Sequence, residues 1–383
     1  MNAVQMQSPS PWDNRLVVLY AVSAFAGIAV GLYNPLISVM LKAGGQSEVA
    51  IGATTSLFFL CIILTAPFAS HIARRFSMRT ALGAGLTIAG LVSSLFPYAD
   101  TLTQWSALRA ALGVGIGLYM IGGQTAVNAF AAESQRTFVV GLHALAFGIG
   151  MGLGPLIGAW LYLTDPKLAF LFCGGILLLG LPALFTWLPP EVSQKTTRLD
   201  RGQIKIISIS LHAVFAYGIA EATLLSLFPI FMLERGYSVS TMSLALSSFV
   251  MGGILSTLPL TKLADRVGQE RVLAYCAVFG VVGSILLAWS PNAILAFLAS
   301  CLAGASFGPV FALAMSIVGR QLSREDLPGG SALFTTAFSL GAMFAPWLDA
   351  LIMRNFGSVH IFTLTSILFG TLFFRLWLKR QAI

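Results

Sequence analysis

Charge is what this sequence has least of. Only 9% of its 383 residues are Asp, Glu, Lys or Arg, whereas 57% are hydrophobic. Soluble domains carry about 25% charged residues, so this chain has too few charged side chains to cover a surface that faces water. The apolar side chains must therefore face lipid. This excludes a water-soluble protein and predicts an integral membrane protein.

Cysteine is also scarce, and its spacing excludes most cysteine chemistry. Each cysteine stands alone inside an apolar run, without the paired spacing of a zinc site or a redox motif. We therefore expect small core residues, and no disulfide, metal or cofactor. The sequence also lacks a glycine loop followed by lysine to cradle a phosphate, so we expect neither ATP as an energy source nor an enzyme. The cysteines are Cys61, Cys173, Cys276 and Cys301.

Long apolar runs are what the sequence has in abundance. Twelve of them follow one another, each near the ~20 residues that cross ~30 Å of hydrocarbon. The first run is too long for the core of a signal peptide and has no basic segment before it, so we expect it to be retained. The predicted spans are 16–41, 50–72, 80–98, 104–130, 138–162, 168–188, 206–233, 240–261, 272–290, 293–318, 329–353 and 358–378.

Basic residues lie mostly on one side of these spans. If the N-terminus is cytoplasmic, 17 of the 22 Lys and Arg residues lie in cytoplasmic segments. This bias follows the positive-inside rule and explains the net charge of +8 without nucleic acid. It predicts a multi-pass protein of the cell inner membrane with both termini in the cytoplasm. We expect a cytoplasmic tail at 1–14, six-helix bundles at 15–188 and 206–383, and a cytoplasmic linker at 189–205.

The two halves of the chain align when the sequence is shifted by about 191 residues. Met40-Leu41-Lys42-Ala43-Gly44 falls near Met232-Leu233-Glu234-Arg235-Gly236, and Gly150-x3-Gly154-Pro155 falls on Gly341-x3-Ala345-Pro346. The sequence therefore predicts an all-α membrane protein with 12 transmembrane helices in two parallel six-helix repeats. Such a build places a solute site near the midplane, between the halves. A monomer is sufficient, because one chain supplies both halves.

Three motifs resemble those of the major facilitator superfamily, over essentially the whole chain. Leu263-Ala264-Asp265-Arg266-Val267-Gly268 is similar to the cytoplasmic-loop motif of that family. Arg109-Ala-Ala-Leu112-Gly113-Val-Gly115 resembles its arginine-glycine motif in the fourth helix. Gly141-x8-Gly150-x3-Gly154-Pro155-x2-Gly158 is similar to the fifth-helix motif of proton-driven exporters. The resemblance implies a secondary transporter that works by alternating access. It also implies conformational roles for Asp265, Arg266, Gly268, Gly150, Gly154, Pro155 and Gly158.

The chain departs from the family pattern at several positions. Arg74 stands where the family usually has aspartate, and Ser77 stands where it has glycine. The first run carries no acidic residue, unlike many exporters of cationic drugs. The stripe of Gly150, Gly154 and Gly158 is also open to two interpretations. Small residues four apart let helices pack closely in lipid, and the same stripe is a candidate sliding hinge between the two halves.

Charged side chains inside the runs are the most informative residues. A charge at the centre of a membrane helix costs about 2.5–3.5 kcal/mol on insertion scales. Arg109 lies in the fourth run, Glu221 near the middle of the seventh and Asp349 in the eleventh. Burial favours the neutral form of a carboxyl group, so Glu221 is predicted to bind and release a proton. Arg109 is either its partner or an anchor for an anionic solute, and the alternative is a purely structural ion pair. Asp349 is either a further proton-coupling group or an interfacial residue.

Uncharged polar and aromatic residues complete the predicted cavity, although each of them also suits contacts between helices. Their pattern favours a neutral or weakly charged organic solute of moderate size. We expect proton-coupled efflux. The alternatives are an importer of an aromatic or vitamin-like nutrient such as riboflavin, and a non-transporting membrane sensor or scaffold. The predicted cavity residues are Asn34, Tyr33, Tyr119, Gln124, Asn128 and Tyr217.

Overall fold

The computed structural model describes residues 10–131, 135–190, 200–323 and 326–381, and its regular elements are all helical. The first nine residues of the predicted tail and residues 191–199 of the predicted linker lie outside these ranges. The first half contains α1 (Asn14–Ala43), α2 (Glu48–Arg75), α3 (Met78–Leu95), the short η1 (Phe96–Tyr98), α4 (Leu102–Phe130), α5 (Arg136–Thr164) and α6 (Pro166–Trp187). The second half contains α7 (Arg201–Ile206), α8 (Ser208–Ser226), α9 (Phe228–Glu234), α10 (Val239–Val267), α11 (Gln269–Ala288), α12 (Ala293–Gln321), α13 (Leu327–Phe356), η3 (Ser358–Phe362) and α14 (Thr363–Gln381).

Twelve helical segments in the described residues are long and apolar enough to cross a membrane, which confirms the predicted spans. Three of these spans are not single α-helices. The third span ends with η1 after α3. The seventh is divided at Leu227 into α8 and α9, because Pro229 has no backbone N–H to continue the helical hydrogen bonds. The twelfth begins with η3 before α14.

The turn that follows the first span is repeated in the second half. Gly45 has a φ of +79° and Gly236 a φ of +80°, a conformation that glycine adopts without the steric penalty of a side chain. Two residues later, Ser47 and Ser238 cap the next helices, and each hydroxyl accepts a hydrogen bond from the backbone N–H three residues on. Equivalent positions of the halves thus have the same local structure, as the internal repeat predicts.

The helices pack in the same pattern within each half. In the first half α1 packs on α5 and α6, and α4 on α2 and α3; in the second half α8 packs on α13 and α14, and α12 on α10 and α11. The halves meet where α2 packs on α13 and where α10 packs on α5. Exchanging the two repeats turns the contact of α2 with α13 into the contact of α10 with α5. The halves are therefore related by an approximate two-fold axis.

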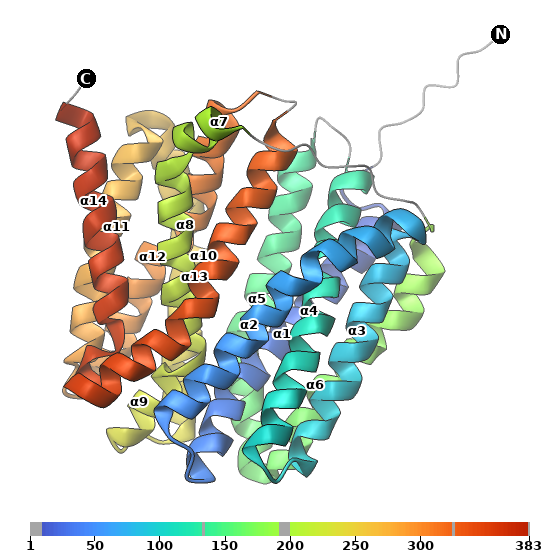
Figure 1. Cartoon of the computed structure of the whole chain (residues 1–383), viewed down its shortest axis with the longest axis vertical. Coiled ribbons are helices and arrows are strands. Elements are labelled where there is room, and N and C mark those ends of the chain that lie inside the picture. The colour runs from blue at the N-terminus through green and yellow to red at the C-terminus, as the bar shows by residue number, and fades with distance from the viewer. Residues whose placement is uncertain (1–9, 132–134, 191–199, 324–325, 382–383) are drawn as a thin grey trace.

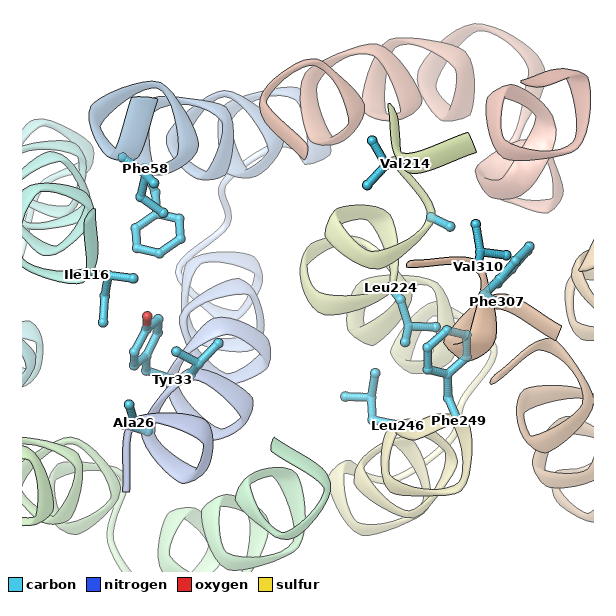
Figure 2. Close-up of a cluster of buried hydrophobic side chains, with 14 of the residues drawn as sticks. Ala26, Tyr33, Phe58, Ile116, Val214, Leu224, Leu246, Phe249, Phe307 and Val310 are labelled. Carbon is cyan, nitrogen blue, oxygen red and sulfur yellow. The ribbon is translucent and has the colours of Figure 1, made fainter. Parts of the chain in front are cut away.

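The first turn of α1, the last turn of α14 and the short helix α7 lie at the same end of the bundle, at the top of Figure 1. We call this end the terminal face. The turn between α1 and α2 and the short helix α9 lie at the other end, which we call the opposite face. The labelled core side chains of Figure 2 form two groups, one on α1, α2 and α4 and one on α8, α10 and α12. Each half therefore has its own packed interior.

Candidate functional site

Arg109 is fully buried on α4, in the part of the helix nearer the opposite face. Its guanidinium donates to the Asn34 side-chain oxygen of α1 at 2.6 Å and to the Thr55 hydroxyl of α2 at 3.1 Å. The guanidinium carbon also lies 5.7 Å from the centre of the Phe58 ring, a favourable cation–π arrangement. Three helices of the first half are thus joined at one cation.

No carboxylate of the described residues pairs with this cation. Among the described residues, no ion pair joins Arg109 to Glu221 or to any other acid. Its Nε atom and the hydroxyl of buried Tyr33 have no hydrogen-bond partner. The predicted pairing of Arg109 with Glu221 is therefore not present in this conformation, and neutral groups alone hold the guanidinium.

Glu221 is half-buried on α8, one turn after Tyr217. The Tyr217 hydroxyl interacts with its carboxyl group, and no cation of the described residues forms an ion pair with it. The Tyr217 ring lies 6.1 Å from that of Phe311 on α12 and 5.9 Å from that of Phe338 on α13. A carboxyl group without a counter-ion is thus placed beside an aromatic cluster.

Asp349 is fully buried on α13, in the same half as Glu221. Its Oδ2 atom is hydrogen-bonded to the Thr223 hydroxyl of α8, and its Oδ1 atom has no partner. No cation of the described part of the chain pairs with it. Asp349 is therefore a second unpaired carboxyl group, and it is more deeply buried than Glu221.

The face of α1 that carries Gly27, Gly31 and Asn34 packs on neighbouring helices. An added Cβ on Gly27 would lie 2.1 Å from the Phe147 carbonyl oxygen, and one on Gly31 would lie 2.4 Å from that of Met151, both on α5. Tyr33 and Asn34 are buried, and Asn34 holds Arg109. These two predicted cavity residues thus lie inside the first half, because α1 turns this face towards α4 and α5.

Two predicted cavity-facing positions of α4 beyond Arg109, towards the terminal face, are exposed. Arg109 is 0% exposed, whereas Met120 is 38% exposed and Gln124, one turn further, is also exposed. The repeat-related position of Met120 is Phe311 on α12, which is 39% exposed. These two equivalent residues are thus accessible to nearly the same extent. Of the remaining predicted residues, Tyr119 is buried, and Asn128 and Tyr217 are half-buried.

Polar contacts between the halves lie nearer the opposite face. Lys42 of α1 and Glu234 of α9 form an ion pair of 2.8 Å, and the Ser247 hydroxyl of α10 donates to the Gly152 carbonyl oxygen of α5 at 2.7 Å. An added Cβ on Gly52 of α2 would lie 2.2 Å from the Pro346 carbonyl oxygen of α13. The halves are therefore tightly joined at this end of the bundle.

The glycines of α5 divide into two sets with different neighbours. An added Cβ on Gly150 or Gly154 would lie 2.2 and 2.5 Å from carbonyl oxygens of α1, and one on Gly158 would lie 2.8 Å from Leu32 of α1. This set packs within the first half, as the packing interpretation expects. The contact with α10 of the second half instead involves Gly148 and Gly152. Pro155 is buried inside α5.

The loop motif lies at the terminal face, between α10 and α11. Gly268 has a φ of +101°, a value that favours glycine, and its N–H donates to the Ala264 carbonyl oxygen at 2.9 Å. Asp265 and Arg266 are exposed. The conformational roles of these three residues remain predictions.

A comparison with known families agrees with this architecture. The family model described as Major Facilitator Superfamily matches residues 19–212 and again residues 210–382, one match for each half. The chain belongs to the major facilitator superfamily. This confirms the resemblance seen in the motifs and makes the protein a transporter of a small solute by family. Superfamily members are transporters rather than enzymes.

Similar proteins within the superfamily cover nearly the whole chain. The uncharacterized MFS-type transporter YfkF of Bacillus subtilis is 26% identical over 361 residues, 91% of this chain and 90% of that protein. The uncharacterized MFS-type transporter YcaD of Escherichia coli is 21% identical over 368 residues, 93% of this chain and 94% of that protein.

Solved structures of superfamily members share the fold at 12% identity. The nucleoside transporter NupG has a TM-score of 0.77 over 95% of this chain and 99% of its own. A bacterial homolog of the human lysosomal transporter Spinster, in an inward-facing and unoccupied conformation, has a TM-score of 0.71. The match covers 94% of this chain and 93% of that chain.

Several residues of the site were missed by the analysis of the sequence. Thr55 and Phe58 complete the surroundings of Arg109, and Thr223 bonds Asp349. Threonine and phenylalanine are common in membrane helices, so neither residue stands out in the sequence. The ion pair of Lys42 with Glu234 could have been suspected, because the sequence alignment of the repeats already places these two residues near one another.

Proposed function

We propose that this protein exports a small organic solute across the cytoplasmic membrane in exchange for protons, with Glu221 as the proton carrier. The main support for the proposal is the environment of the Glu221 side chain. It is half-buried near the middle of a membrane helix and has no cationic partner among the described residues. Ionisable groups at such depth usually serve an ion or solute pathway.

The orientation follows from the distribution of basic residues. With the terminal face in the cytoplasm, 17 of 22 Lys and Arg residues lie on the cytoplasmic side. The contacts between the halves near the opposite face then close the protein to the outside. The exposed Met120 and Gln124 of α4 and Phe311 of α12, which lie in the parts of these helices nearer the terminal face, support a cavity that opens to the cytoplasm. This arrangement is the inward-facing state of an alternating-access cycle, which a single chain can carry out.

The accessible side chains favour a flat organic solute that is neutral or weakly charged. Phe311 and Met120 offer apolar surface from the two halves, and Gln124 offers an amide. Aromatic side chains bind flat rings by stacking or edge contacts. Arg109 is covered by Asn34 and Thr55, so we assign it to joining α1, α2 and α4 rather than to an anionic solute.

Uptake of an aromatic or vitamin-like nutrient is the second candidate, because the cluster of Tyr217, Phe311 and Phe338 suits such a solute in either direction. The two candidates differ in the direction of the proton. Export by exchange moves the solute against the proton flow, whereas import with protons moves it along that flow.

The test is transport by purified protein in liposomes, with flavins, aromatic metabolites and common antimicrobials as trial solutes. We expect an imposed pH gradient to drive the solute against the proton flow in the wild type. Glu221→Gln should abolish this movement and retain solute exchange without a gradient, because the amide cannot release a proton. The matched control is Glu270→Gln, which removes a half-exposed carboxylate paired with Lys379 at 2.6 Å. Full gradient-driven transport in Glu221→Gln would overturn the proposal.

A further inference from the structure

Asp349 and Thr223 lie together beside the contact between the two halves. Asp349 is on α13 and Thr223 on α8, and both side chains are 0% exposed. The α13 surface next to Asp349 is covered by α2 of the other half. An added Cβ on Gly52 of α2 would lie 2.2 Å from the Pro346 carbonyl oxygen and 3.0 Å from the Ala350 side chain. The carboxyl group thus lies beside a contact that must separate when the opposite face opens.

The hydrogen bonds of Thr223 determine where the proton of this pair lies. Its hydroxyl oxygen is 2.9 Å from the Ile219 carbonyl oxygen and within hydrogen-bond distance of Asp349 Oδ2. A hydroxyl group has one proton to donate, and a carbonyl oxygen can only accept. Two separate hydrogen bonds form when Thr223 donates to Ile219 and a protonated Asp349 donates to Thr223, whereas an ionised Asp349 must share the single Thr223 proton with the Ile219 carbonyl oxygen. The geometry therefore favours a protonated Asp349.

The surroundings of Asp349 lead to the same protonation state. The elements packed on α13 are α2, α8, α12, α14 and η3, and no charged or titratable side chain of the described residues acts on Asp349 from them. Its Oδ1 atom has no partner. An ionised carboxylate here would have at most one donor and no counter-ion, which costs several kcal/mol in a dry interior. The neutral acid avoids most of that cost.

We propose that Asp349 is a second proton-binding site, positioned by Thr223, whose proton is held while the halves are closed at the opposite face. Loss of that proton leaves a bare carboxylate in the closed contact, so it favours separation of α2 from α13 and access of water. Asp349 therefore takes up its proton from the side of the membrane at which the opposite face lies. This uptake favours closure of the two halves at that face. Its part in transport rests on the proposed proton coupling, but its proton is detectable without any solute.

The first test is infrared spectroscopy of the purified protein in lipid, because a protonated carboxyl group has a C=O stretching band that a carboxylate lacks. Near neutral pH we expect a band that disappears in Asp349→Asn and persists in Glu221→Gln. Absence of any band that depends on Asp349 would overturn the proposal. The transport behaviour of Glu221→Gln does not affect this result. Failure of the proposal for Asp349 can therefore be distinguished from failure of the proposed function.

Substitutions of Thr223 test the site without removing the carboxyl group, and they apply even if Asp349→Asn does not fold. Thr223→Val has nearly the same shape but cannot accept a hydrogen bond, so the band should shift to higher frequency. Thr223→Ser keeps the hydroxyl group and should leave the band in place. A band that Thr223→Val does not move would overturn the positioning role of Thr223.

The link to closure is tested by the distance between spin labels on exposed Ala43 and Ser238, which lie on the two halves at the opposite face. In the wild type we expect the population with a long distance to grow as the pH rises. In Asp349→Asn, which resembles the neutral acid, the short distance should persist at every pH. The same pH response in both proteins would overturn the coupling of this proton to closure.

Discussion

Lys42 of α1 and Glu234 of α9 lie 192 residues apart, and their side chains meet at 2.8 Å across the opposite face. With the shift that pairs Gly45 with Gly236, Lys42 corresponds to Leu233, and Glu234 corresponds to Ala43, the residue after Lys42. Such nearly equivalent positions can touch only close to the two-fold axis that relates the halves. Each half thus supplies one of two opposite charges near this axis, and their attraction joins the halves. Lys42 also contacts Glu48 of its own half.

Removing the charge of Glu234 should weaken the closure of the opposite face. Both side chains of the ion pair are about one-third exposed, and such pairs contribute about 1 kcal/mol at most. For Glu234→Gln we therefore expect up to about a fivefold shift of the conformational equilibrium towards the open form. The spin-label distance between Ala43 and Ser238 measures this shift.

Glu48→Gln is the matched control for that substitution, because it removes the other carboxylate of Lys42 and leaves the contact between the halves in place. It should shift the equilibrium less than Glu234→Gln does. Equal shifts in the two variants would show that the net charge near Lys42, and not the contact between the halves, controls closure.

The neutral partners of Arg109 make a second prediction about stability. Asn34→Leu removes the 2.6 Å hydrogen bond to a buried guanidinium, and a hydrogen bond to a charged group contributes about 1.5–3 kcal/mol. Asn34→Asp instead places a carboxylate beside the cation. Thermal unfolding of the purified protein should occur at a lower temperature in Asn34→Leu, and at least as high as in the wild type in Asn34→Asp. Unchanged unfolding in Asn34→Leu would mean that Arg109 does not depend on this bond.

The close contact between α1 and α5 gives a prediction at one glycine. An alanine Cβ at Gly150 would lie 2.2 Å from the Ala24 carbonyl oxygen, so the two helices would have to separate. Overpacking of this kind costs about 1–3 kcal/mol. Gly150→Ala should therefore lower the yield of folded protein and its unfolding temperature. Gly175→Ala on α6 is the control, because its added Cβ meets no atom within 4 Å, and a stability loss of equal size there would contradict the packing argument.

The spans and the repeat could be predicted because their signals are local in the sequence. Apolar runs give the length of each helix, and Gly45 and Gly236 mark the same turn in both halves. The surroundings of the charged groups could not be predicted in this way. Asn34 is 75 residues from Arg109, and Thr223 is 126 residues from Asp349, so each contact depends on how separate helices rotate and cross.

The face of α5 illustrates the same limit. Gly148, Gly150, Gly152 and Gly154 alternate along the sequence, and spacing alone indicates that some of them allow close packing. Only the positions of the neighbouring helices show that Gly150 and Gly154 face α1, while Gly148 and Gly152 face α10 of the other half. A motif can therefore be recognised in the sequence before its neighbours are known.

The exchange of a proton for solute at Glu221 is tested most directly by proton release on binding. A solute found in the transport screen is added to purified protein in weak buffer that contains a pH indicator. We predict that the wild type releases protons in proportion to the solute it binds near neutral pH, and that Glu221→Gln binds the solute without releasing them. Equal proton release by the two proteins, or proton uptake by the wild type, would contradict exchange at this residue.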